Sequence, residues 1–121
     1  MASTASDVNR FVNALFTGQL LDQRSLSEML RTTPLSGLPP TLQAEYGLGI
    51  ACETDMEFGR HYGHDGSGPG YRAVTSHTPQ LHNTTITVLC NTDNCNPRRI
   101  SDSLMRIVLH SLKESQFPPS G

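Results

Sequence analysis

The residues with the clearest chemical potential lie in one glycine-rich stretch, residues 62–71 (YGHDGSGPGY). Glycine weakens the packing of a strand, so a group of glycines marks a place where another group approaches the backbone closely. His64 stands among them and can carry or transfer a proton near neutral pH. An isolated strand histidine is more often structural, but these glycines leave the backbone around it accessible. The stretch therefore predicts a site built around His64.

Metal binding and phosphate binding fit this pattern poorly. His61 and His64 are three positions apart, so on a regular strand they point to opposite faces and cannot easily share one ion. His77 and His82 add no carboxylate or thiol at a useful spacing. A phosphate-binding loop needs Gly-Lys followed by Ser or Thr, whereas the only lysine is Lys113. We expect neither a metal nor a cofactor.

Ser67 does not match a nucleophile elbow, because Asp65 stands where that motif has its first glycine.

Composition and charge argue against further classes of protein. A net charge of -2 argues against a nucleic-acid binder, since the only basic doublet is Arg98-Arg99. No apolar run approaches the roughly 20 residues that span a membrane, and the N-terminus lacks the layout of a signal peptide.

The three cysteines, Cys52, Cys90 and Cys95, are too few and odd in number for a disulfide framework. We expect free, partly buried thiols, because isolated cysteines behave as small hydrophobic residues. A bridge between Cys90 and Cys95 is also conceivable, since residues 91–94 could form a turn between them.

Helical periodicity marks three segments of the chain. Residues 4–17 place apolar side chains at i, i+3, i+4, i+7 and i+8, and residues 23–31 form a shorter helix capped by Asp22 or Ser25. A third helix begins at the Asn96 cap. Its predicted apolar stripe consists of Ile100, Leu104, Ile107, Val108 and Leu112.

Between the helices the chain predicts a loop and then strands. Residues 34–44 contain three prolines and predict the loop. The expected strands are residues 46–52, 58–63, 71–76 and 84–89. Short connections favour an antiparallel meander of three to four strands. The fold class is therefore α+β, with two N-terminal helices and a C-terminal helix packed on the sheet.

Four segments, in order, resemble the serine β-lactamase-like hydrolases, which include class C β-lactamases, D-alanyl-D-alanine carboxypeptidases and related esterases. Residues 1–11 resemble the family's STASDLARF helix start, and residues 46–49 resemble its YGLGW strand. Residues 62–71 resemble its third motif, Lys/His-x-Gly, with the turn that follows. Residues 91–97 resemble the end of its last core strand and the cap of its C-terminal helix.

The family's other two motifs are absent from this sequence. Its nucleophile lies in Ser-x-x-Lys, but His110 stands three residues before Lys113. Its second motif, Tyr-x-Asn or Ser-x-Asn, is also missing. The resemblance therefore implies that residues 1–121 are the C-terminal part of such a hydrolase domain, with a helical segment at 1–33 and the sheet with its C-terminal helix at 45–116.

The resemblance also implies roles for individual residues. His64 takes the cationic or proton-handling place of the third motif, and Gly66 keeps the strand open for substrate. The backbone N–H of Ser67 supplies one of two oxyanion-hole donors. Substrate binding falls to Asp65, Gly68 and Tyr71. Asp65 departs from the family's usual Thr or Ser, which disfavours substrates with a carboxylate and favours an ester or amide.

The function expected from these residues is that of a fragment of a serine acyl hydrolase, inactive alone, whose completed site takes a small acyl substrate. The alternatives are a non-catalytic binding or regulatory module derived from the same fold, or an inactive remnant. The family is often periplasmic or extracytoplasmic, but no compartment is assigned to this chain. The strand at 84–89 pairs with an N-terminal strand in the family, so its edge is expected to promote self-association.

Overall fold

The computed structural model describes residues 2–39, 43–117 and 120. Three helices and a six-stranded antiparallel sheet confirm the α+β prediction. The strands lie side by side in the order in which they occur along the chain. The elements are α1 (Ala5–Phe16), α2 (Gln23–Met29), β1 (Thr33–Pro34), β2 (Ala44–Tyr46), β3 (Ala51–Asp55), β4 (Gly59–Gly68), β5 (Tyr71–Thr78), β6 (Thr84–Cys90) and α3 (Pro97–Gln116).

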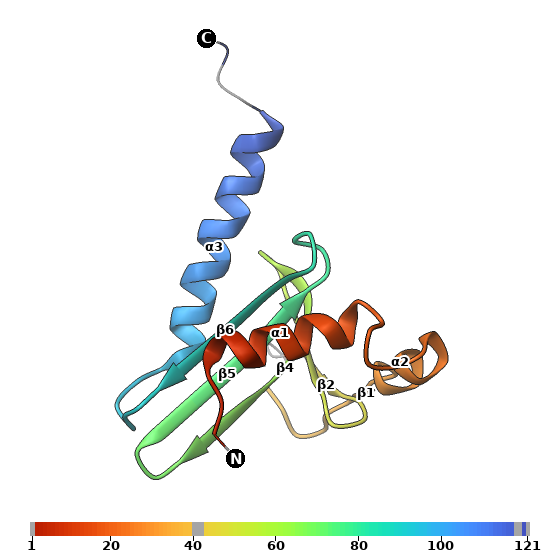
Figure 1. The fold of residues 1–121 in the computed structure, drawn as a ribbon, viewed down its shortest axis with the longest axis vertical. Helices are drawn as coiled ribbons and strands as arrows, with labels where there is room; N and C mark the ends of the chain where they lie inside the picture. The colour runs from red at the N-terminus through yellow and green to blue at the C-terminus, as the bar shows by residue number, and fades with distance from the viewer. Residues whose placement is uncertain (1, 40–42, 118–119, 121) are drawn as a thin grey trace.

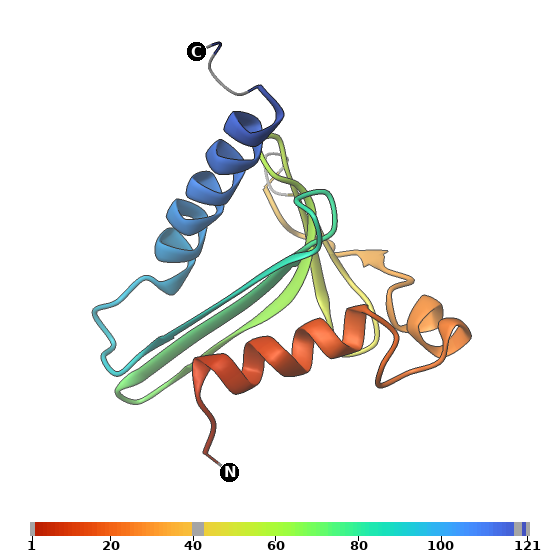
Figure 2. The ribbon, with the colours of Figure 1, turned by 45° about the horizontal axis from the view of Figure 1, so that its top comes forward.

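The two longer helices lie on opposite faces of the sheet. Helix α1 crosses one face over β5 and β6, and α3 covers the other, so the sheet is the middle of three layers (Figures 1 and 2). On the α1 side, Val12 and Leu15 are buried, and the Phe16 ring stacks on buried His77 with the ring centroids 4.0 Å apart. These contacts fix α1 across the strands that carry the candidate site.

The first two helices form where the sequence predicts them. Thr4 caps α1 by accepting a hydrogen bond from the Asp7 N–H, and Asp22 caps α2 by accepting one from the Ser25 N–H at 2.7 Å. Helix α2 ends at Met29, two residues before the predicted end. The last carbonyl group of this helix is hydrogen-bonded, because the Met29 carbonyl oxygen accepts from the Leu48 N–H at 3.1 Å.

The prediction of one strand over residues 46–52 is wrong. Those residues form a hairpin that joins β2 to β3, closed by a hydrogen bond from the Gly47 N–H to the Ile50 carbonyl oxygen at 2.8 Å. Gly49 has φ of 72°, a left-handed conformation that favours glycine in a turn. The hairpin, together with short β1, raises the strand count from the predicted three or four to six.

The strand predicted over residues 58–63 is longer than expected and includes most of the glycine-rich stretch. Strand β4 continues from Gly59 through Gly68, and the chain reverses only at Pro69 and Gly70. Gly70 adopts φ of 79°, as the second central residue of a Pro-Gly turn requires. Its N–H donates to the Asp93 carboxylate at 2.8 Å, so the segment after β6 holds this turn in place.

Helix α3 begins as predicted but buries a different face. Asn96 accepts the Arg99 N–H at 3.2 Å, and Pro97 follows as the first helical residue. Met105 is buried and packs with Phe58, Leu81 and Ile86 to form the core on this side. Three members of the predicted stripe are instead exposed: Ile100, Leu104 and Ile107. The buried face consists of Ser101, Met105, Leu109 and Leu112.

Strand β6 forms one edge of the described sheet. Asn9 of α1 donates from its side-chain amide to the Thr85 carbonyl oxygen at 3.1 Å and accepts from the Thr87 hydroxyl at 2.9 Å. The helix therefore ties down this strand and satisfies one of its carbonyl groups. Self-association through the edge of β6 stays a prediction, since a single chain does not test it.

The prediction of three free thiols is wrong for two of them. Cys90 and Cys95 form a disulfide that joins the end of β6 to the residue before the α3 cap. Cys52 remains a free thiol, is buried, and has a raised pKa because burial disfavours its charged form. A neutral, buried thiol is a poor nucleophile.

Thiol counting should separate these three cysteines. Without reductant, we expect no reactive thiol in the folded chain, one after unfolding, and three after unfolding with reductant. Ellman titration measures each number. Three reactive thiols in the unreduced, unfolded chain would rule out the disulfide, and rapid reaction of the folded chain would contradict the burial of Cys52.

Candidate functional site

The glycine-rich end of β4 has a neighbouring strand on one side only. Strand β3 pairs with β4 at the five residues from Gly59 to Gly63 and no further. Strand β5 pairs with β4 from Tyr62 to Gly68. Residues 64–68 therefore have β5 on one edge, while the described part of the chain places no strand on the other. An open strand edge offers backbone N–H and C=O groups to an extended ligand.

The surface above this edge is also open. A methyl group added to Gly66 would meet no atom within 4 Å, and the same holds for Gly68. Gly63 differs, because a methyl group there would run into the Thr75 carbonyl group and lie 3.1 Å from the Ser76 Cα. Gly63 is therefore needed for close packing of two strands, whereas Gly66 leaves free space where the resemblance expects a substrate.

His64 lies on the α1 side of the sheet, exposed, with both ring nitrogens hydrogen-bonded. Nδ1 is 2.6 Å from the Asp65 carbonyl oxygen, and Nε2 is 2.9 Å from the Tyr46 hydroxyl. A carbonyl oxygen only accepts, so Nδ1 must carry a proton. In the neutral ring Nε2 is then the acceptor, and Tyr46 donates to it. The basic atom of His64 thus faces the Tyr46 hydroxyl.

An apolar pocket of about 160 Å³ adjoins His64 on the same face. Helix α1, the end of α2 and the β2–β3 hairpin supply most of its wall. Side chains that line it include Phe11, Leu15, Phe16, Met29, Ile50 and Thr75. Its volume is close to the roughly 150 Å³ that accommodates a benzene molecule in a protein interior. The site therefore combines one imidazole with room for an apolar group.

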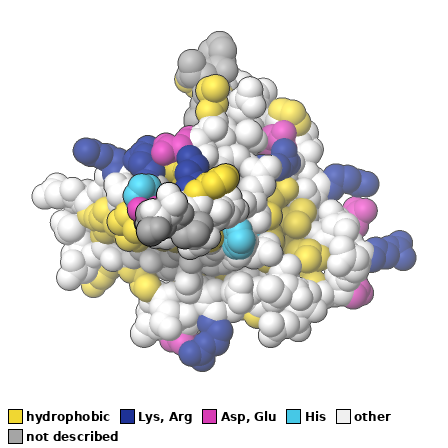
Figure 3. Space-filling model, turned by 90° about the horizontal axis from the view of Figure 1, so that it is seen from above, with side chains coloured by type: hydrophobic (Ala, Val, Ile, Leu, Met, Phe, Trp, Pro, Cys, Tyr) yellow, Lys and Arg dark blue, Asp and Glu magenta, His cyan; other side chains and the backbone are white. Residues whose placement is uncertain are grey.

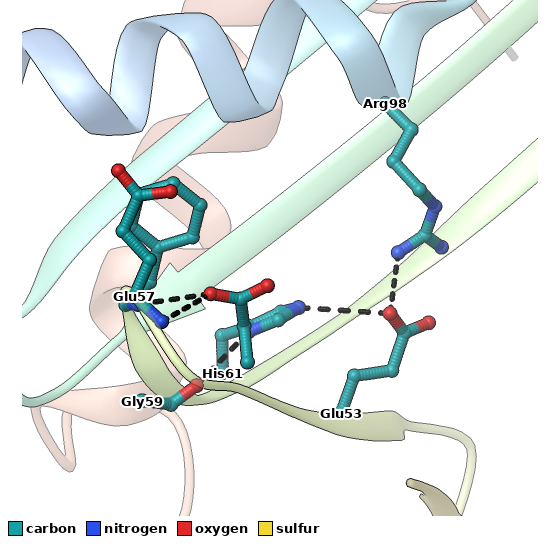
Figure 4. Close-up of polar contacts among 7 residues, drawn as sticks. Glu53, Glu57, Gly59, His61 and Arg98 are labelled. Carbon is teal, nitrogen blue, oxygen red and sulfur yellow. Dashed lines mark hydrogen bonds and ion pairs between the residues drawn. The ribbon is translucent and has the colours of Figure 1, made fainter. Parts of the chain in front are cut away.

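Asp65 belongs to the opposite face of the sheet, because successive strand side chains alternate. With Glu53, His61 and Arg98 it lines a cavity of about 50 Å³ under the N-terminus of α3. Glu53 accepts a hydrogen bond from Arg98 at 2.6 Å and lies 3.7 Å from His61 Nε2 (Figure 4). The Glu53 contact raises the pKa of His61, and His61 in turn lowers the pKa of Glu53.

The structure thus turns the Asp65 carboxylate away from the His64 ring, which weakens its expected repulsion of an anionic substrate. The other predicted residues do come together. Gly66, Ser67, Gly68 and Tyr71 line one shallow pocket of about 250 Å³ along the end of β4 and the start of β5. All four are exposed. Their roles in oxyanion stabilisation and substrate binding stay predictions.

Two residues of this region are absent from the sequence-based site. Tyr46 reaches His64 because the β2–β3 hairpin places Tyr46 opposite Ala51, which in turn lies opposite Gly63. The spacing of Gly47 and Gly49 was the available signal, since two glycines in four residues favour a turn. Asp93 fixes the Pro69–Gly70 turn from a segment more than twenty residues away, and no local pattern predicts such a contact.

Lys and Arg side chains lie close to Asp and Glu side chains at several places on the face shown in Figure 3. Two ion pairs of the structure, Arg60–Glu45 and Arg98–Glu53, each have a nitrogen–oxygen distance of 2.6 Å. Among the described residues, no three His, Cys, Asp or Glu side chains are grouped so that they could hold a metal ion. The helices in the described ranges are too short or too polar to cross a membrane.

Known proteins share the sequence pattern and the fold of this chain. The sequence matches the Beta-lactamase family over residues 1–109. This chain belongs to that family. No curated protein sequence matches it. The fold is shared with a D-stereospecific amidohydrolase from Streptomyces sp., at 25% identity and a TM-score of 0.67, over 98% of this chain and 31% of the amidohydrolase.

Two further solved structures show the same fold. D-amino acid amidase from Ochrobactrum anthropi SV3 superposes with a TM-score of 0.68 at 24% identity, over 94% of this chain and 32% of the amidase. A penicillin binding protein from Bacillus halodurans gives 0.66 at 20% identity, over 86% of this chain and 30% of that protein. The chain therefore spans about a third of the length of each of these structures.

Proposed function

We propose that this chain supplies one side of the active site of a serine acyl hydrolase. That side is the edge of β4, residues 64–68, which carries the third motif. The observation that carries the proposal is the open edge of β4 from His64 to Gly68, with free space above Gly66. In a β-lactamase-family protein this edge is where the acyl group would lie. The nucleophile and its lysine belong to Ser-x-x-Lys, which the sequence lacks, so the chain by itself is inactive.

His64 and Ser67 have separate roles in the proposed reaction. The imidazole of His64 transfers a proton at Nε2, or bears a positive charge, beside the reacting acyl group. The backbone N–H of Ser67 donates one of two hydrogen bonds to the oxyanion that forms when the acyl carbon is attacked. A preorganised donor of this kind stabilises a transition state by roughly 3–4 kcal/mol. The other donor comes from the nucleophilic serine itself.

We also propose an amide or ester, rather than a β-lactam, as the substrate. Asp65 replaces the hydroxyl residue that could bind a substrate carboxylate, so position 65 offers no hydroxyl group for that contact. The similar Streptomyces and Ochrobactrum proteins are named as an amidohydrolase and an amidase of D-configured substrates. The apolar pocket beside His64 favours an acyl substrate with an apolar side chain.

A fluorophosphonate probe tests whether the chain holds a nucleophile. Such probes form a covalent bond with activated serines, so we expect no labelling of this chain by intact-mass measurement. A complete serine hydrolase of the same family serves as the positive control. Stoichiometric labelling of this chain would show that one of its own serines is activated, and would overturn the claim that it is inactive alone.

The coding sequence upstream of Met1 tests the proposed parent enzyme. We expect it to encode Ser-x-x-Lys and Tyr-x-Asn in the same reading frame, in that order. If it encodes neither, the chain is not part of a larger hydrolase, and the non-catalytic binding module becomes the better explanation. The fluorophosphonate result does not depend on this outcome, so the two tests can fail separately.

A further inference from the structure

Tyr46 and His64 form a hydrogen-bonded pair. Tyr46 begins the segment that resembles YGLGW, but the resemblance assigns it no role towards His64. Tyr46 lies at the end of β2, and His64 lies two strands away on β4. The hydroxyl of Tyr46 is 2.9 Å from His64 Nε2, and the two rings meet edge to face with their centroids 5.9 Å apart. The contact therefore joins β2 to β4 across the strand between them, β3.

We infer that Tyr46 is a positioning residue for His64. Together with the Asp65 carbonyl oxygen, it holds the imidazole in its Nδ1–H form with Nε2 as the proton-accepting atom. The bond from Nδ1 to the Asp65 carbonyl oxygen, at 2.6 Å, involves the neighbouring residue of the same strand. That bond fixes one end of the ring, and Tyr46 fixes the other. The hydrogen bond made by one imidazole nitrogen decides the protonation of the other.

The choice of a phenol as partner has a further consequence. A phenolic hydroxyl both donates and accepts, unlike a carboxylate or an ammonium group. It donates to Nε2 when His64 is neutral and accepts from Nε2–H when His64 is charged. The ring therefore keeps both of its hydrogen bonds while a proton is added or removed. His64 can change its charge without leaving its place on the open edge of β4.

The hydrogen bond between Tyr46 and His64 is present whatever the protein does, but its role in a reaction rests on the proposed function. If the edge of β4 forms one side of an acyl-hydrolase site, Tyr46 keeps the His64 Nε2 atom in one position during the reaction. Tyr46 itself is about two-fifths exposed. A substrate group entering the site can therefore reach the hydroxyl as well as the imidazole.

Nitrogen-15 NMR of the 121-residue chain tests this inference without any need for enzymatic activity. Two-bond proton–nitrogen spectra, recorded at a pH where the imidazole is neutral, report which nitrogen carries the proton. His64→Gln identifies the His64 signals among those of the five histidines. We expect wild-type His64 in the Nδ1–H form. A phenolic hydroxyl is a stronger donor to Nε2 than an acceptor from Nε2–H, so it favours the Nδ1–H form. Tyr46→Phe should therefore shift the ratio several-fold towards the Nε2–H form, by at most about tenfold.

Tyr71→Phe is the matched control, because it removes a phenolic hydroxyl from the neighbouring hairpin and should leave the ratio unchanged. An unchanged ratio in Tyr46→Phe, with a backbone amide spectrum that shows a folded chain, would overturn the inference. So would a wild-type His64 in the Nε2–H form, which needs no variant. Neither result bears on fluorophosphonate labelling or on the upstream motifs, so the proposed function can stand or fall separately.

Discussion

Gly63→Ala should prevent stable folding of this chain. The added methyl group would run into the backbone carbonyl group of Thr75 and lie 2.9 Å from its carbonyl carbon. Both atoms belong to the backbone of β5, which pairs with β4 from Tyr62 to Gly68 and cannot turn aside as a flexible side chain would. We expect a loss of at least about 3 kcal/mol in the free energy of unfolding, measured by urea denaturation.

Gly66→Ala is the control, three residues further along the same strand. Its methyl group would meet no atom within 4 Å, so the free energy of unfolding should change by less than about 1 kcal/mol. Equal destabilisation by the two variants would contradict the difference in packing between them. The comparison matters for function, because it separates a glycine required by the fold from a glycine that leaves room for a substrate.

The second large effect is a loss of stability in mild acid that depends on His77. This side chain is completely buried, stacks on Phe16 and has its Nδ1 2.8 Å from the Thr85 hydroxyl. Burial lowers the pKa of His77 from its ordinary value of 6.5. Below that pH the unfolded chain binds a proton that the folded chain does not. Stability is therefore full above pH 6.5 and is lost as the pH falls through the folded-state pKa.

His61 should act with the opposite sign. Its contact with Glu53 raises the pKa of His61 above 6.5, so the folded chain keeps a proton that the unfolded chain has already released. The stabilisation is full below pH 6.5 and is lost as the pH rises through the folded-state pKa. The lowered pKa values of Glu45 and Glu53 act in more acidic solution, below their ordinary value of 4.5.

Urea denaturation of two variants across this pH range measures both effects. His77→Gln should flatten the dependence below pH 6.5, and His61→Gln should flatten the dependence above it. One proton contributes a slope of at most about 1.4 kcal/mol per pH unit. Each variant is the control for the other. His77→Gln should leave the pH dependence of stability above pH 6.5 unchanged, and His61→Gln should leave the dependence below it unchanged. A His77→Gln chain that retains the full acid-side slope would show that His77 is not its source.

Helix α3 shows how far hydrophobic periodicity alone can predict packing. Ile100, Leu104 and Ile107 are spaced i, i+4 and i+7, and so are Met105, Leu109 and Leu112. Both sets satisfy the rule for one apolar face of a helix. The sequence predicts the helix and its cap correctly, but only contact with Phe58, Leu81 and Ile86 of the sheet selects the second set for burial.

The hairpin at Gly47–Ile50 illustrates a related difficulty. Alternating apolar residues and glycines in residues 46–52 fit a strand, and the same glycines fit a turn. Strand pairing decides between the two, because each of the resulting strands has a partner with which it can form hydrogen bonds. The free-thiol prediction for Cys90 and Cys95 is wrong for a similar reason, since their spacing allows a bridge across residues 91–94 but does not require it.

The sequence by itself determined the α+β class, the three helices, the Asn96 cap, the family and the segment that carries the candidate site. These properties depend on local spacing and on motifs of neighbouring residues. Only the tertiary structure decided that Tyr46 meets His64, that Asp65 faces the α3 side, and that β3 ends where the open edge of β4 begins. Such features depend on strand register, which joins residues far apart in the chain and is fixed by the turns and by packing of the buried face together.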